Sequence, residues 1–239
     1  ATNLDLLGRP DEARARLRQL YDQALNDGQR RTALGAMAVS YIAGGDFPGA
    51  LTQVQRQYDL AAAAGDHAAM SADVNFMGNI LLEMGRFDEA RARFEETVAL
   101  LDEAQNTSEE VKDLARLTYH YDAGRVAAWS GQLPEAKEHL SEYQSRAEAN
   151  RNQFQIWAAH QLAGIIAIQE QDWDEAVSRI GRSNPQNPFN SYLLGVAYRG
   201  QGDGERAKQQ FDRAANFNVA GNAQLAFARQ RLGASSDDT

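Results

Sequence analysis

The chain has 239 residues, of which 43% are hydrophobic and 24% charged, a balance typical of a globular protein that buries a sizeable core. Its net charge of −9 repels a phosphate backbone, so the composition argues against nucleic-acid binding. The sequence has no cysteine, which excludes disulfides and thiolate chemistry, and its longest apolar run, 162–168, is too short for membrane insertion.

Six short segments share one pattern, in which a turn precedes an acidic residue or proline and then an alanine. In chain order they are 7–13, 44–50, 84–90, 130–136, 170–176 and 201–207. A left-handed glycine ends one helix in this pattern, and Asp or Pro with Glu begins the next. The final alanines recur at intervals of 37, 40, 46, 40 and 31 residues. The sequence therefore predicts a series of paired helices.

A second small residue recurs seven positions before each turn. These residues are Ala38, Gly78, Gly124, Gly164 and Gly195. A glycine in the middle of a helix costs about 1 kcal/mol relative to alanine. Four glycines in the same phase therefore predict close backbone packing against the partner helix.

The order of small residue, Tyr or Leu, turn glycine and alanine resembles the tetratricopeptide repeat. Gly195, Tyr198, Gly202 and Ala207 match it closely. The resemblance covers 1–217 and implies an all-α fold, a right-handed α-α superhelix (solenoid) of about five and a half repeats. Gln171 departs from the pattern because it replaces a turn glycine. The long spacings are similar to those of long-helix bacterial variants, and the Ala-, Arg- and Asp-rich composition also indicates a bacterium.

Both ends of the chain differ from a complete repeat. Ala1 occupies the small-residue place of the first copy. We therefore expect the chain to begin halfway along a helix, as a fragment of a longer protein or a mature exported chain; cytoplasmic and exported locations both stay open. At the other end, 218–233 is predicted to be a capping helix and 234–239 a disordered tail.

The resemblance also implies where a ligand would bind, because the first helix of each pair lines the concave groove of such arrays. By this analogy the predicted groove residues are Asn75, Asn79, Glu83, Tyr121, Arg125, Trp129 and Gln161. Aromatic, arginine and amide side chains are what peptide-binding surfaces favour. The alternative is that these side chains pack and cap between repeats.

Asn79 raises a sharper hypothesis. In tetratricopeptide domains that bind chaperone tails, an Asn at this place joins a two-carboxylate clamp, which also needs a Lys four residues earlier, a second Asn and basic residues. In this sequence those places hold Asn75, Asp122 and the apolar Leu162. Asp122 would repel a carboxylate, so the clamp is excluded. Arg125 is left as a single anchor for an acidic group.

The remaining chemistry-bearing residues favour a non-catalytic protein. His120 and His160 occupy equivalent places, but no third ligand has metal spacing with either, so we expect them to pack between helices and expect no metal. His67 and His139 are expected to be exposed near helix ends. The sequence has no nucleophile elbow, zinc-protease motif, P-loop or calcium loop, so we expect neither catalysis nor a cofactor.

The sequence thus predicts a scaffold that binds a protein or peptide partner in the groove of a superhelix. The alternative is a structural or regulatory segment of a larger bacterial protein, such as an effector-sensing or oligomerisation arm. Assembly into a homo-oligomer stays open.

Overall fold

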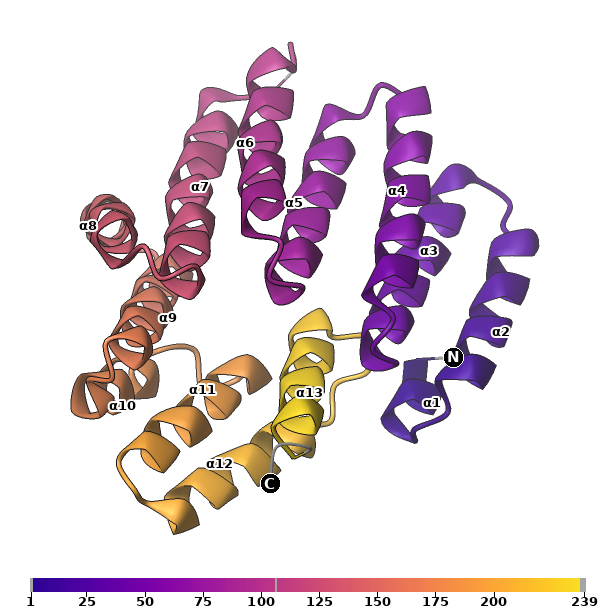
Figure 1. Cartoon of the computed structure of the whole chain (residues 1–239). Coiled ribbons are helices and arrows are strands. Elements are labelled where there is room, and N and C mark those ends of the chain that lie inside the picture. Colours follow the sequence, from indigo (N-terminus) through magenta and orange to yellow (C-terminus); the bar gives the residue numbers. More distant parts are fainter. Residues whose placement is uncertain (1, 106, 237–239) are drawn as a thin grey trace. The chain divides into compact units, whose positions relative to one another are not determined.

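The computed structural model describes residues 2–105 and 107–236, with side chains as far as Gly233 (Figure 1). These residues form thirteen α-helices and no strand, so the predicted all-α fold is confirmed. Within each of the chain's compact units, consecutive helices pack against each other in the manner of an α-solenoid. The chain divides into two compact units. The first contains the segment up to Thr107 and the segment from Asn218 onward, and the second is Ser108–Phe217.

The first unit is built from seven helices. They are α1 (Thr2–Leu6), α2 (Pro10–Asp22), α3 (Asp27–Ala43), α4 (Phe47–Ala63), α5 (His67–Glu83), α6 (Phe87–Glu103) and α13 (Ala223–Ser236). Helices α1 to α6 pack in chain order as pairs, and α1 also contacts α3. The odd-numbered members are therefore the first helices of their pairs. The last helix of the chain, α13, packs against α3.

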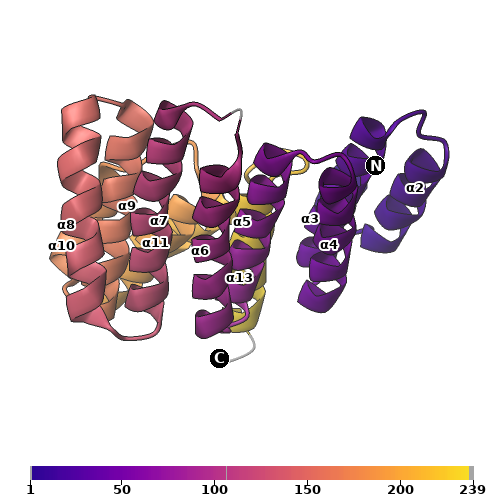
Figure 2. The same ribbon diagram turned by 90° about the horizontal axis from the view of Figure 1, so that it is seen from above.

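The second unit continues the same pairing with six helices. They are α7 (Glu109–Trp129), α8 (Leu133–Asn150), α9 (Gln153–Gln169), α10 (Trp173–Gly181), α11 (Pro188–Gly200) and α12 (Gly204–Ala215). The first helices of the pairs contact one another, α7 with α9 and α9 with α11. Figure 2 shows α7, α8 and α9 running alongside each other. The first helices α7, α9 and α11 therefore present one continuous face.

The turns within the pairs have the predicted geometry. Gly85 and Gly202 have φ of +71° and +82°, in the left-handed region that glycine adopts without strain. After the glycine, an aspartate commonly caps the next helix: the carboxylate of Asp203 accepts a hydrogen bond from the backbone N–H of Arg206 at 2.9 Å. The same chemistry recurs between α4 and α5 at Gly65 and Asp66, a turn outside the six repeated segments.

Gln171 adopts the left-handed conformation without being glycine, with φ of +60°. A side chain in this region costs about 1–2 kcal/mol. We therefore expect Gln171→Gly to raise the free energy of unfolding by about 1 kcal/mol, measured by urea denaturation followed by tryptophan fluorescence. The matched control is Gly202→Gln at the equivalent turn, where an added Cβ meets no atom within 4 Å. It should lose about 1 kcal/mol; a neutral or destabilising Gln171→Gly would contradict the strain.

The glycines inside the helices lie where the predicted close packing occurs. An ideal Cβ on Gly78 would stand 2.6 Å from Cε1 of Phe94, and one on Gly195 would stand 2.4 Å from the ring of Phe211. In each case the aromatic ring belongs to the second helix of the same pair. The prediction of close approach at these glycines is confirmed, and their cost in helix propensity is offset by packing.

The C-terminal helix differs from its predicted bounds. It begins at Ala223 because Gly221 is left-handed, with φ of +71°, and the side chain of Asn222 accepts a hydrogen bond from the backbone N–H of Leu225 at 3.0 Å. It extends through 234–236 and ends at Ser236, beyond the expected end at Gly233. The rest of the expected tail, 237–239, lies outside the described residues.

Candidate peptide-binding groove

The predicted groove residues all lie on first helices of pairs, but in different units. Asn75, Asn79 and Glu83 lie on α5 in the first unit, whereas Tyr121, Arg125 and Trp129 on α7 and Gln161 on α9 lie in the second. The residues of each unit therefore form a separate candidate binding site.

The α5 group makes contacts inside the chain. The side-chain amide of Asn79 donates to the backbone oxygen and to Oδ1 of Asn75, at 2.9 and 3.0 Å. Glu83 accepts two hydrogen bonds from Arg231 of α13, at 2.7 and 3.3 Å. Two of the predicted ligand-binding side chains of α5, those of Asn79 and Glu83, are therefore hydrogen-bonded to other residues of the protein.

In the second unit a chain of hydrogen bonds crosses the three first helices. The hydroxyl of Tyr121 on α7 donates to Oε1 of Gln161 on α9, and Nε2 of Gln161 donates to Oδ1 of Asn190 on α11. The amide of Asn190 in turn donates to the backbone oxygen of Asn184 at 2.9 Å. Burial raises the pKa of Tyr121, so its hydroxyl keeps the proton that it donates. These bonds hold the side chains of Tyr121, Gln161 and Asn190 in fixed positions on the face formed by α7, α9 and α11.

A pocket of about 180 Å³ opens on this face, beside the three hydrogen-bonded side chains. It is lined by Tyr121, Phe154, Trp157, Ala158, Gln161, Asn184, Asn187 and Asn190. One wall is aromatic: Phe154, at the start of α9, is 72% exposed and packs edge-on against Trp157 with ring centroids 5.5 Å apart. An exposed phenylalanine beside a tryptophan is typical of an anchor for an apolar side chain.

A second part of the lining, the amide wall, consists of asparagine side chains. Oδ1 of Asn184 accepts from the backbone N–H of Gln186, and Oδ1 of Asn187 accepts from that of Phe189, at 2.9 and 3.0 Å. Within the described part of the chain, neither Nδ2 group has a hydrogen-bond partner, so both can donate to a ligand oxygen. None of the lining residues is charged. The pocket therefore fits an uncharged peptide segment.

The sequence predicts Tyr121 and Gln161 as groove residues, and both line this pocket, but it does not predict the aromatic and amide walls. Asn187 is the N-cap of α11, and Pro188 follows it at the first helical position. This N-cap and proline signal could have placed Asn187 at a helix start. No comparable sequence signal predicts that Phe154 is exposed, because its exposure depends on which face of α9 the first turn of that helix presents to solvent.

Arg125 and Trp129 do not line this pocket. Arg125 is only 7% exposed, and its guanidinium lies 3.2 Å from the carboxylate of Asp122 and 5.3 Å from the ring centre of Tyr121. Asp122, one turn earlier on the same helix, neutralises the charge of Arg125. The pocket therefore lacks the anchor for an acidic group that the sequence suggested. Trp129 is half-buried at the end of α7.

Two histidines of this unit, His120 and His139, pack between helices. Nδ1 of His120 lies 3.1 Å from Nδ1 of His139, and burial lowers the pKa of His120. The prediction of packing for His120 is confirmed. The prediction of an exposed His139 is wrong, because α8 begins at Leu133 and turns this residue toward α7. No cluster of three or more metal-ligating side chains occurs among the described residues.

The paired helices and stacked first-helix faces define a class of repeat protein, and the comparisons identify the repeat. Residues 29–103 match a tetratricopeptide repeat family model, and residues 1–19 match a second model of the same repeat. The chain therefore contains tetratricopeptide repeats. No curated protein matches the sequence. In the described part of the chain, no helix combines the length and apolar character that a membrane span requires.

Two solved structures are similar to the chain. The first is BtubC (BKLC) from P. vanneervenii, with 15% identity and a TM-score of 0.54 over 98% of this chain and 92% of that one. The second is a Podosopora anserina protein described as a kinesin light chain with nearly identical TPR-like repeats, with 16% identity and a TM-score of 0.44 over 96% and 92%. At these identities the likeness to BtubC concerns the fold alone.

Proposed function

We propose that this chain is a scaffold that binds a peptide segment of a partner protein in the second unit. Tetratricopeptide repeats are generally scaffolds for protein–protein interaction and are typically non-catalytic. The observation that carries the proposal is the pocket between the aromatic wall of Phe154 and Trp157 and the amide wall of Asn184 and Asn187.

The lining of the pocket defines the chemistry of the partner. A volume of about 180 Å³ is smaller than the 300 Å³ or more of sites for drug-sized ligands, and it suits a single side chain. An apolar side chain would pack against Phe154 and Trp157, while the Nδ2 groups of Asn184 and Asn187 donate to backbone carbonyls beside it. The partner segment is therefore uncharged at its anchor and extended enough to expose its carbonyls.

A peptide array tests this proposal. Random twelve-residue peptides are screened with the full chain, and the affinities of the best binders are measured by isothermal titration calorimetry. We expect the binders to share one large apolar residue and no required charge. Phe154→Ser should weaken them by about 30-fold, the loss typical of a hot-spot residue. Because Phe154 is 72% exposed, this change should leave the fold intact.

Val111→Ser is the matched control, because Val111 is also an exposed apolar residue of the second unit but does not line the pocket. It should leave the affinities unchanged. Binders that depend on an acidic residue, or that keep their affinity in Phe154→Ser, would place binding elsewhere and contradict the proposal.

A further inference from the structure

In the first unit a helix already lies against the face formed by the first helices. Helix α13 packs on α3, and its residues Leu225 and Ala226 share a small cavity with Leu6 of α1 and Val39 of α3. This face corresponds to the one that carries the pocket in the second unit, since α1, α3 and α5 are the first helices of their pairs. α13 therefore occupies a place where a partner segment would bind.

Two polar anchors hold α13 at the C-terminal ends of α3 and α5. The amide of Gln230 donates to the backbone oxygen of Ala43, the last residue of α3, at 2.8 Å. A helix leaves its last carbonyls without partners inside the helix, so this bond satisfies one of them. Arg231 forms a two-pronged ion pair with Glu83, the last residue of α5, at 2.7 and 3.3 Å. The negative end of the α5 dipole also favours the arginine.

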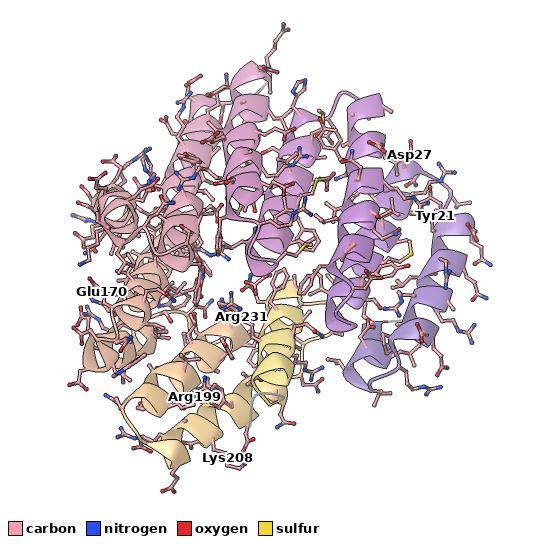
Figure 3. All side chains as sticks on the ribbon, viewed as in Figure 1. Tyr21, Asp27, Glu170, Arg199, Lys208 and Arg231 are labelled. Carbon is pink, nitrogen blue, oxygen red and sulfur yellow. The ribbon has the colours of Figure 1, made fainter. Side chains whose placement is uncertain are left out.

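The charges on the two sides are complementary. From Ala223 to Gly233, α13 carries two arginines and no acidic residue, in a protein whose net charge is −9. Figure 3 shows the side chain of Arg231 on this helix. The opposing face supplies Glu83, whose side chain is only 4% exposed, and Asp5, which lines the same cavity as Arg229. A buried carboxylate is costly unless a cation pairs with it. The face therefore requires a basic helix.

The covalent connection makes α13 a tethered occupant. Residues 216–222 join it to α12 without helical structure, and its two anchors contact residues 187 and 148 positions away in the chain. A tether raises the effective concentration of such a segment, so that modest contacts keep it bound. A separate helix of similar chemistry could make the same contacts.

We propose that the face formed by α1, α3 and α5 is a binding site for a basic amphipathic helix of a partner protein, and that α13 occupies this site in the free protein. The partner helix presents a Leu-Ala ridge and, five to six residues later, an arginine that pairs with Glu83. It displaces α13 by competing for the same carboxylate. This site is independent of the pocket in the second unit, so either can fail without the other.

A labelled peptide of residues 222–233 serves as the probe, and its binding to the full chain is measured by fluorescence anisotropy. The wild-type chain should bind it weakly, because α13 competes. In Arg231→Glu the tethered helix is weakened while the probe keeps its arginine, so binding should tighten at least ten-fold, about 1.4 kcal/mol. Hydrogen exchange of residues 224–232 should accelerate in this variant, while exchange of α7 to α9 stays unchanged.

The controls separate a binding site from a structural contact. Lys208→Glu makes the same charge change on an exposed residue of the second unit and should alter neither readout. Glu83→Arg should prefer a probe that carries the Arg231→Glu change. Unchanged exchange of α13 in Arg231→Glu would overturn the proposal. So would a released α13 without tighter probe binding. Should Arg231→Glu lose its helical signal, Arg231→Gln is subjected to the same two measurements.

The source of the occupying helix is tested by sedimentation of the wild-type chain at increasing concentration. We expect a monomer at every concentration, with α13 bound to its own chain. A dimer that Arg231→Glu abolishes would show that α13 binds a second copy, and it would overturn its assignment as the tethered occupant.

Discussion

Gly164→Ala is expected to lower the free energy of unfolding by about 3 kcal/mol, the upper end of the usual cost of overpacking a core. An ideal Cβ at this position would lie 2.3 Å from Cγ1 of Ile180 and 3.3 Å from its backbone nitrogen. Ile180 is buried on α10, so both its side chain and its backbone would have to move. Urea denaturation followed by tryptophan fluorescence measures the loss directly, because all three tryptophans lie in the second unit.

A double-mutant cycle identifies the contact that causes this loss. Ile180→Ala alone should cost about 2–5 kcal/mol through the cavity that it leaves. The two changes together should cost at least 1 kcal/mol less than their sum, because the new methyl group fills part of that cavity. Gly181→Ala is the control: an added Cβ there meets nothing within 4 Å. Equal losses for Gly164→Ala and Gly181→Ala, or additive effects in the cycle, would contradict the packing argument.

Gly164 also illustrates what the sequence alone can predict. The need for a small residue follows from the repeat, in which the same position recurs at Gly78 and Gly195, and the structure confirms the close approach there. Turn glycines are predictable for a similar reason, since a left-handed φ is a local property of the backbone. The departure at Gln171 was visible as a break in the pattern, and its φ of +60° shows that the turn keeps its geometry despite the side chain.

Contacts between distant segments were not predictable in the same way. Glu83 was expected to face the groove from a first helix, but the structure pairs it with Arg231, which lies 148 residues away in the chain. Any of the chain's 24 lysines and arginines could have served as that partner. The hydrogen bond between Tyr121 and Gln161 required the relative rotation of α7 and α9, which the periodicity does not specify. The candidate site could therefore be predicted from the sequence much less fully than the fold could.

Arg31→Met is the second change with a large expected effect, about 3–5 kcal/mol, because it leaves a buried carboxylate without its counter-charge. Arg31 on α3 binds both oxygens of Asp73 on α5, at 2.7 and 3.2 Å, and also donates to the backbone oxygen of Gln57. Asp73 is only 3% exposed. Replacing both partners, as Arg31→Met with Asp73→Leu, should recover most of the loss, since a buried pair and an apolar pair of similar volume are often nearly equal in stability.

The dependence of this loss on pH distinguishes an unpaired charge from lost packing. Burial raises the pKa of Asp73 above its ordinary value of 3.8, while the hydrogen bond and charge of Arg31 lower it. Removing Arg31 therefore raises this pKa further. A carboxyl whose pKa is higher in the folded state stabilises the fold when it is protonated, and this contribution is lost as the pH rises. The deficit of Arg31→Met relative to the wild type should thus be smaller at pH 5 than at pH 8, measured by urea denaturation followed by circular dichroism. Equal deficits at the two pH values would show that Arg31 acts through packing alone.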